Sequence, residues 1–108
     1  MIFLRELKKG STKILILTLL EKKPMYGYEI IKEIKNRSKN YFNISEGTLY
    51  PALHSLERNS LVKSRWHKFK GRERKYYYLT KKGLKFAQKA SKEWNLFVQN
   101  LAVFLAIK

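Results

Sequence analysis

Residues 43–57 place hydroxyl, imidazole and small side chains opposite a set of apolar ones. Leu49, Ala52, Leu53 and Leu56 recur at steps of three and four, so all four share one face of a helix. The other face carries small, polar, aromatic and basic residues: Gly47, Thr48, Tyr50, Pro51, His54, Ser55 and Arg58. A helix that packs on one face and offers such groups on the other suits the major groove of DNA.

Five residues of this segment are candidates for contact with DNA. Ser45 and Thr48 offer hydroxyl groups to base edges or phosphates, and Tyr50 can reach a phosphate. His54 can enter the groove, and Gly47 permits close approach of the backbone. Taken alone, the segment also fits an ordinary amphipathic helix with a solvated face.

A basic hairpin is expected shortly after this helix. Residues 62–69 alternate partly in polarity, residues 74–79 include three consecutive tyrosines, and residues 70–72 form the tip between them. Basic residues crowd this tip: Lys68, Lys70, Arg72 and Arg74, with Lys63, Arg65, His67 and Lys75 nearby. Such a tip can reach phosphates or the minor groove. Interleaved basic and aromatic residues also suit the binding of single-stranded nucleic acid. Some of the tyrosines are nevertheless expected to pack against Trp66 and the helices.

The composition supports a polyanionic partner. The chain has 108 residues, 24 Lys and Arg against 8 Asp and Glu, and a formal net charge of +16. Such an excess indicates nucleic acid more often than an anionic membrane surface. A hydrophobic content of 44% excludes a disordered tail and supports one small domain over residues 1–108.

The sequence offers little for catalysis or metal binding. Cysteine is absent, and His54 and His67 are the only histidines, so we expect no zinc centre. Glu46 and Glu57 have no matched carboxylate partner, and neither a catalytic triad nor a glycine-rich phosphate loop is recognisable. We therefore expect a protein that is not an enzyme and has no cofactor.

The expected compartment is the cytoplasm, with the protein on the nucleoid when bound to DNA. The apolar run at residues 14–20 is far below the ~20 residues needed to span a bilayer, and no small-residue cleavage site follows it. It is interpreted as core, and no membrane partner is expected.

Two helices are expected before the DNA-contacting segment. The first runs from near Ser11, a potential cap, to about residue 22, where the approach to Pro24 ends it. Gly10 is expected to break whatever precedes this helix. The second begins at Tyr26 or Gly27 and ends at Arg37.

The third helix has two possible caps. Either Asn43, with a glutamate at the third helical position, or Ser45 could begin it. Pro51 favours a helix that starts late or bends in its first turns, because proline lacks an N–H group.

A long final helix is expected from residue 81 to near 108, with Thr80 as its cap. Its apolar residues follow a heptad pattern: Ala87, Ala90, Trp94, Phe97, Leu101 and Phe104, widened by Val98 and Leu105. At ~1.5 Å per residue the helix is roughly 40 Å long, more than a small domain is wide. The stripe therefore predicts a partner, most simply a second copy of the chain.

The expected fold is mainly α with a small β-hairpin. Residues 1–80 form a winged helix-turn-helix region, and residues 81–108 form a dimerisation helix.

The chain resembles the PadR family of bacterial transcriptional regulators. The matching segments run in the family's order across roughly residues 10–83: Pro24-Met25-Tyr26-Gly27-Tyr28-Glu29-Ile30, then Ser45-Glu46-Gly47-Thr48-Leu49-Tyr50-Pro51-Ala52-Leu53-His54 with Leu56-Glu57, Leu61-Val62, Gly71-Arg72, Lys75-Tyr76-Tyr77, Leu79-Thr80 and Lys82-Gly83. The short C-terminal part, one long helix with a central Trp, is similar to the small subfamily of multidrug-sensing repressors.

The resemblance implies a homodimer that binds a palindromic double-stranded operator and represses transcription. It implies one recognition helix per half-site with hairpin tips on flanking DNA, and we add Tyr26 of the first matching segment to the expected DNA contacts. In the small subfamily the last helix completes the dimer, and a central cavity can take planar aromatic ligands. Trp94 and Phe97, with Leu15, are the corresponding candidates for such a cavity, although each could equally be plain core.

Two other binding classes compete with a repressor. One is a winged-helix protein that binds DNA or RNA without sequence preference and has no effector. The other is a basic module for protein–protein or membrane-surface contact. Specific binding to a palindrome in the upstream region separates a repressor from the first class, and duplex binding beside vesicles separates it from the second.

Overall fold

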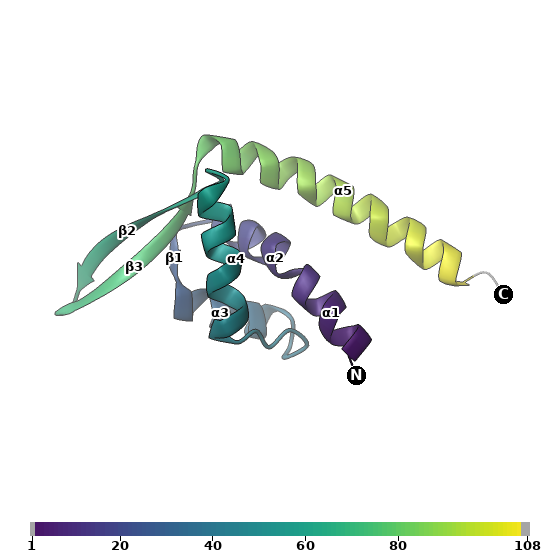
Figure 1. The fold of residues 1–108 in the computed structure, drawn as a ribbon, viewed down its shortest axis with the longest axis horizontal. Coiled ribbons are helices and arrows are strands. Elements are labelled where there is room, and N and C mark those ends of the chain that lie inside the picture. Colours follow the sequence, from purple (N-terminus) through teal and green to yellow (C-terminus); the bar gives the residue numbers. More distant parts are fainter. Residues whose placement is uncertain (1, 107–108) are drawn as a thin grey trace.

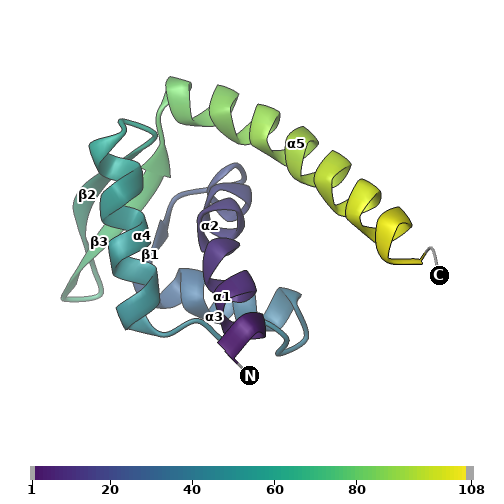
Figure 2. The ribbon, with the colours of Figure 1, turned by 45° about the vertical axis from the view of Figure 1, so that its right-hand side comes forward.

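The computed structural model describes residues 2–106 as five helices and a small antiparallel sheet (Figure 1). The elements are α1 (Ile2–Gly10), α2 (Thr12–Leu20), β1 (Met25–Tyr26), α3 (Gly27–Arg37), α4 (Glu46–Arg58), β2 (Val62–Phe69), β3 (Arg72–Leu79) and α5 (Lys81–Ala106). The mainly helical winged-helix architecture with a long last helix confirms the expected fold class. The molecule measures 58 × 30 × 21 Å, and the hairpin and α5 reach out in different directions from the central helices (Figures 1 and 2).

The N-terminal residues form a helix that the sequence reasoning did not predict. Gly10 was expected to break whatever precedes it, and Ser11 to cap the next helix. Instead Ser11 has helical dihedrals (φ −86°, ψ −9°), and its Oγ donates back to the Leu7 carbonyl at 3.0 Å. Ser11 is therefore the N-cap position of α2, as expected, but its hydroxyl caps no N–H group of that helix, and α1 leads into α2 with only a local change at Ser11.

Helix α4 begins at the later of the two predicted positions. Ser45 is its N-cap, with extended dihedrals (φ −81°, ψ 163°), so Asn43 is not the cap. The Ser45 hydroxyl donates to Thr48 Oγ1 at 3.3 Å and does not bond a backbone N–H. The helix continues through Pro51 to Arg58.

The sheet has the strand order β1-β3-β2 and is antiparallel throughout. Strands β2 and β3 pair from Val62↔Leu79 to Phe69↔Arg72, which confirms the hairpin and extends its second strand to residue 72. Lys70 (φ 51°) and Gly71 (φ 77°) form the two-residue turn, where two positive φ angles match the twist of the strands. The short strand β1, which was not predicted, pairs Met25 with Tyr77 and Tyr26 with Tyr76.

The core lies where α2, α3, α4 and the base of the sheet meet. Ile16, Ile30, Leu49 and Leu53 are completely buried there, together with Tyr77 of β3. These positions match the apolar spacings of the sequence, and they turn the polar face of α4 outward. Among residues 2–106, no helix combines the length and the apolar character needed to cross a bilayer.

A tight corner fixes the start of α5. Thr80 Oγ1 accepts the Gly83 N–H at 2.9 Å and donates to the Ser60 carbonyl at 2.7 Å, so the predicted Thr80 cap is confirmed. A Cβ at Gly83 would lie 1.9 Å from the Leu61 carbonyl oxygen, so only glycine fits this approach. The direction of α5 is thus set by the turn between α4 and β2. The predicted helix end near Lys108 lies outside the described residues.

Candidate nucleic-acid interface

Helix α4 separates its two faces as the sequence predicted. Leu49, Leu53 and Leu56 are buried in the core. Ser45, Gly47 and His54 are exposed, and Thr48 is half-buried beside the first turn. These four positions share an outer surface of α4, as contact with a duplex groove requires.

Tyr50 belongs to the packing between two helices as well as to the polar face. A Cβ at Gly27 would lie 2.2 Å from the Tyr50 hydroxyl oxygen, so the tyrosine ring lies directly against the first residue of α3. Tyr50 is half-buried and packs on the core. Its side chain therefore fixes the spacing of α3 and α4, while its hydroxyl remains at the edge of an adjoining groove.

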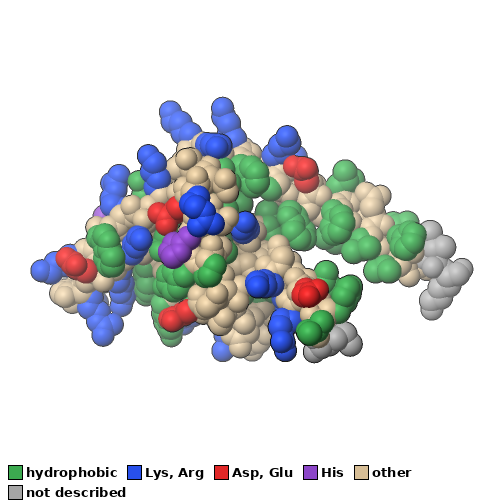
Figure 3. Space-filling view, viewed as in Figure 1, with side chains coloured by type: hydrophobic (Ala, Val, Ile, Leu, Met, Phe, Trp, Pro, Cys, Tyr) green, Lys and Arg blue, Asp and Glu red, His purple; other side chains and the backbone are tan. Residues whose placement is uncertain are grey.

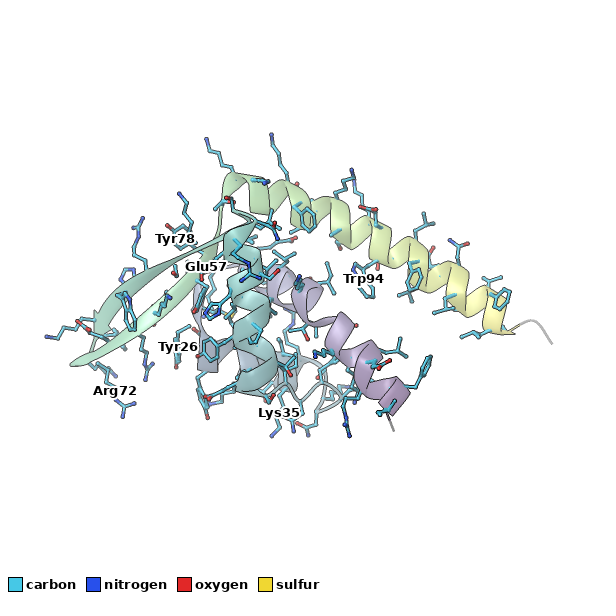
Figure 4. All side chains as sticks on the ribbon, in the orientation of Figure 1. Tyr26, Lys35, Glu57, Arg72, Tyr78 and Trp94 are labelled. Atoms are coloured by element: carbon cyan, nitrogen blue, oxygen red, sulfur yellow. The ribbon has the colours of Figure 1, made fainter. Side chains whose placement is uncertain are left out.

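That groove lies between α4, the start of α3 and the hairpin, and has a volume of about 570 Å³. Its lining contains three cations and several aromatic rings and no carboxylate: Tyr26, Gly27, Tyr28, Tyr50, Trp66, Arg72, Arg74, Lys75 and Tyr77. Positive charge, phenol hydroxyls and flat rings without a competing acid suit a sugar-phosphate backbone. Figure 4 shows Tyr26 beside α4 and Arg72 near the far end of the hairpin.

The outer face of the hairpin is a chain of aromatic and cationic contacts. Tyr76 packs edge-on against both Tyr26 and His67, each with ring centroids 5.5 Å apart. The Arg74 guanidinium lies 4.3 Å from the Tyr26 ring, and Arg65 lies 5.4 Å from Tyr78. Such cation–π contacts hold the arginine stems while leaving part of the charge available to a phosphate.

The hairpin tip carries exposed charge. Lys70 and Arg72 are exposed at the turn, and Lys70 Nζ lies 5.5 Å from the Phe69 ring. Lys68 is exposed as well and lies opposite Glu73 in the strand register. Trp66 is 64% exposed, and Tyr77 is the buried tyrosine, which packs with the helices as expected.

A half-buried polar pair ties the hairpin base to α4. Ser64 Oγ donates to Glu57 Oε2 at 2.9 Å. Burial, with smaller effects from Glu57 and Tyr50, raises the pKa of Tyr77 to about 12. The Tyr77 phenol therefore ionises at a higher pH than a solvated tyrosine, and the Ser64–Glu57 hydrogen bond joins the hairpin base to α4.

Basic side chains gather over the hairpin and the adjoining ends of α4 and α5, while apolar side chains follow α1 and the far half of α5 (Figure 3). Within residues 2–106, no three His, Cys, Asp or Glu side chains come close enough to hold a metal ion. The hairpin end of the molecule is thus basic, and the far half of α5 is mostly apolar.

The apolar stripe of α5 divides into a covered and an uncovered part. Ala87 is buried by its own chain, where α5 packs on α2, and Ala90 is half-buried. The expectation that Ala87 faces a second copy is therefore wrong. Phe97, Leu101 and Phe104 are exposed, Phe104 by 73%.

Trp94 lies at the boundary between these two parts. It is 36% exposed, and its ring packs edge-on against Phe97 with centroids 6.0 Å apart. It extends from α5 toward the side on which α1 and α2 lie, away from the hairpin (Figure 4). Leu15 of α2 is half-buried and packs against the core.

Five groove residues were not among the predicted contacts: Gly27, Tyr28, Trp66, Lys75 and Tyr77. Trp66 and Lys75 share the sheet face that looks toward α4, and Tyr28 enters from the start of α3. Alternation along the paired strands could have placed Trp66 opposite Lys75. Tyr28 could not be placed without the unpredicted strand β1, which positions the start of α3.

Comparisons with known proteins agree with this architecture. The family model for the transcriptional regulator PadR-like family matches residues 16–89. A PadR family transcription regulator from Clostridium difficile R20291 is 39% identical with a TM-score of 0.78, over 90% of this chain and 100% of that one. A transcriptional regulator from Clostridium thermocellum is 32% identical with a TM-score of 0.80, over 95% and 96% of the two chains. The transcriptional regulator Rv3488 of Mycobacterium tuberculosis is 31% identical over 80 residues, covering 74% of this chain and 72% of the relative.

Proposed function

The chain belongs to the PadR-like family of transcriptional regulators, and from this premise we propose that it is a homodimeric repressor of a palindromic operator. It would act in the cytoplasm on the nucleoid. The observation that carries the proposal is the groove between α4 and the hairpin, which gathers three cations and no carboxylate beside the outward face of α4.

In this proposal α4 contacts the base edges of the DNA, and the hairpin contacts the DNA backbone. Thr48 and His54 would contact base edges in the major groove, with Ser45 and Gly47 at the helix entrance. The backbone contacts would come from the hairpin and β1: Tyr26, Lys68, Lys70, Arg72 and Arg74. Tyr50 would present its hydroxyl to a phosphate while its ring keeps α3 and α4 apart.

A binding assay on an operator and on a scrambled duplex tests the specific part of this proposal. The operator candidate is a palindrome from the region upstream of the gene. Thr48→Ala and His54→Ala should lose roughly 1–3 kcal/mol of discrimination between the two duplexes. Gln88→Ala, an exposed polar change on α5, is the matched control and should keep wild-type discrimination. Equal affinity of the wild type for both duplexes would support the non-specific nucleic-acid binder instead.

The dimer is supported by two apolar surfaces that the chain leaves open. Phe3 and Leu7 of α1 are exposed, as are Leu101 and Phe104 of α5. Around α5 beyond Trp94 apolar side chains occur on nearly every side, which is typical of a helix buried between neighbours. A second copy would cover both surfaces and set two half-sites about one DNA turn, or a multiple of it, apart.

A planar aromatic effector is the remaining part of the proposal. Trp94, with Phe97 and with Leu15 of α2, would form a wall of a cavity at the dimer axis, and indole faces attract flat rings and cations. Trp66→Phe leaves Trp94 as the only tryptophan, so its quenching by a panel of planar dyes reads this site directly. Unquenched Trp94 fluorescence, or equally tight dye binding by Trp94→Ala, would assign Trp94 to packing alone.

A further inference from the structure

A second basic pocket lies apart from the groove between α4 and the hairpin. It has a volume of about 560 Å³ and lies between α1, the segment before α4 and the first turn of α4. The residues that matter to its chemistry are Arg5, Lys8, Lys9, Thr12, Ser45 and Gly47. No carboxylate lines it. The pocket therefore joins the cationic side of α1 to the positive end of the helix that faces DNA.

The first turn of α4 offers free donors to this pocket. Thr48 and Leu49 donate their backbone N–H groups to the Ser45 carbonyl, at 3.1 and 2.9 Å. The backbone N–H groups of Glu46 and Gly47 lie before the first of these hydrogen bonds, so they have no partner within the helix. The Ser45 side chain does not cap them either. Two uncapped amides at the positive end of a 13-residue helix favour an anion.

Thr12 gives a second, independent indication that the pocket binds a polar group. Its side chain is 2% exposed and lines the same pocket, and its Oγ1 has no hydrogen-bond partner within the described part of the chain. A buried hydroxyl without a partner is unfavourable and uncommon in folded proteins. An anion in the pocket would accept a hydrogen bond from the Thr12 hydroxyl.

The cations of α1 complete the site. Lys8 is already engaged, because its Nζ donates to the Tyr41 carbonyl at 2.9 Å and lies 4.2 Å from the Tyr41 ring. Arg5 and Lys9 are exposed, and neither has an ion-pair partner among residues 2–106. These two side chains are available to a ligand that also reaches the α4 amides.

We propose that this pocket is a phosphate-binding site, formed by the first amides of α4, the Thr12 hydroxyl, and the Arg5 and Lys9 side chains. The phosphate belongs either to the backbone of the DNA that α4 contacts or to a free phosphomonoester. The first source rests on the proposed function, because it needs DNA on α4. The second does not.

A titration of the full chain with inorganic phosphate tests the site without DNA. The amide NMR signals of Glu46 and Gly47 should shift and saturate. Thr12→Val keeps the side-chain shape but removes the hydroxyl, so it should weaken binding roughly tenfold or more. Its thermal stability should stay equal or rise, because an unpaired hydroxyl is replaced by a methyl group. Lys89→Ala, an exposed charge-matched change on α5, should bind as wild type does.

The salt dependence of DNA binding identifies the source of the phosphate. Arg5→Ala should make the slope of log K against log salt shallower by about 0.9 relative to Lys89→Ala if a DNA phosphate occupies the pocket. An unchanged slope, with phosphate binding that still depends on Thr12 and Arg5, identifies a free phosphomonoester. An unchanged slope with no variant-sensitive amide shift overturns the site. Failure of the wild type to bind DNA would overturn the proposed function, and the phosphate titration would still decide the pocket.

Discussion

Arg72 and Lys75 line the groove between α4 and the hairpin, so replacing each with alanine tests whether the DNA backbone runs through it. Arg72 is exposed near the hairpin tip, and Lys75 lies closer to α4 on the second strand. Neither residue belongs to the hydrophobic core. We therefore expect both variants to fold normally and to lose affinity for every duplex, whatever its sequence.

The expected magnitude follows from counterion release. Each neutralised phosphate contributes about 0.9 to the slope of log K against log salt, so a variant that loses one contact has a slope shallower by about 0.9. Between about 50 and 200 mM salt, the affinity of either single variant should then fall by a factor about 3.5-fold smaller than that of the wild type. For the variant that carries both Arg72→Ala and Lys75→Ala, the factor should be about 12-fold smaller.

Fluorescence anisotropy with a labelled random duplex measures this slope, because phosphate contacts do not depend on sequence. Lys89→Ala on α5 removes the same charge from a surface far along the chain from the groove, and thermal melting confirms that each variant is folded. If Arg72→Ala and Lys75→Ala have the slope of Lys89→Ala, the backbone does not pass through the groove and the reasoning fails.

Three further changes probe the scaffold and the assembly. Gly83→Ala should lower the free energy of unfolding by roughly 1–3 kcal/mol or more, because its Cβ would meet the Leu61 carbonyl oxygen at 1.9 Å; Gly10→Ala, with open space around it, should melt no lower than the wild type. The raised pKa of Tyr77, about 12 against 10 in the unfolded chain, contributes stability that is complete below pH 10 and is lost as the pH rises toward 12. Urea unfolding of Tyr77→Phe should therefore show a smaller alkaline loss than the wild type, and an equal loss would contradict this origin. Leu101→Lys should give a monomer or an unfolded chain in sedimentation, whereas a wild-type monomer at micromolar concentration would rule out the dimer.

The elements that depend on neighbours in sequence could be predicted from residue spacing. The steps of three and four in Leu49, Leu53 and Leu56 predicted the buried face of α4, and the structure confirms it. Thr80 was recognised as a cap because its hydroxyl serves an N–H only three residues away. A helical repeat and a cap are local, so a single segment contains the whole signal.

Segments with weaker local signals were misread. A glycine at position 10 predicts a helix break, yet α1 includes Gly10, because one glycine costs a helix only about 0.5–1 kcal/mol relative to alanine. Strand β1 has two residues, too few for an alternating pattern, and it exists only because β3 lies beside it. The helix α1 and the strand β1 could therefore be identified only from the folded structure.

The sequence by itself predicted a basic winged-helix protein of a recognisable family, with a helix suited to the major groove, a charged hairpin tip and an apolar last helix. The tertiary structure decided which side chains share a surface: that Tyr50 lies against Gly27, that Ala87 is covered by its own chain, and that Thr12 of α2 borders the same pocket as the first turn of α4. The physical reason is that periodicity and capping act over a few residues, while a groove or a pocket forms between segments that are brought together only by burial of the common core.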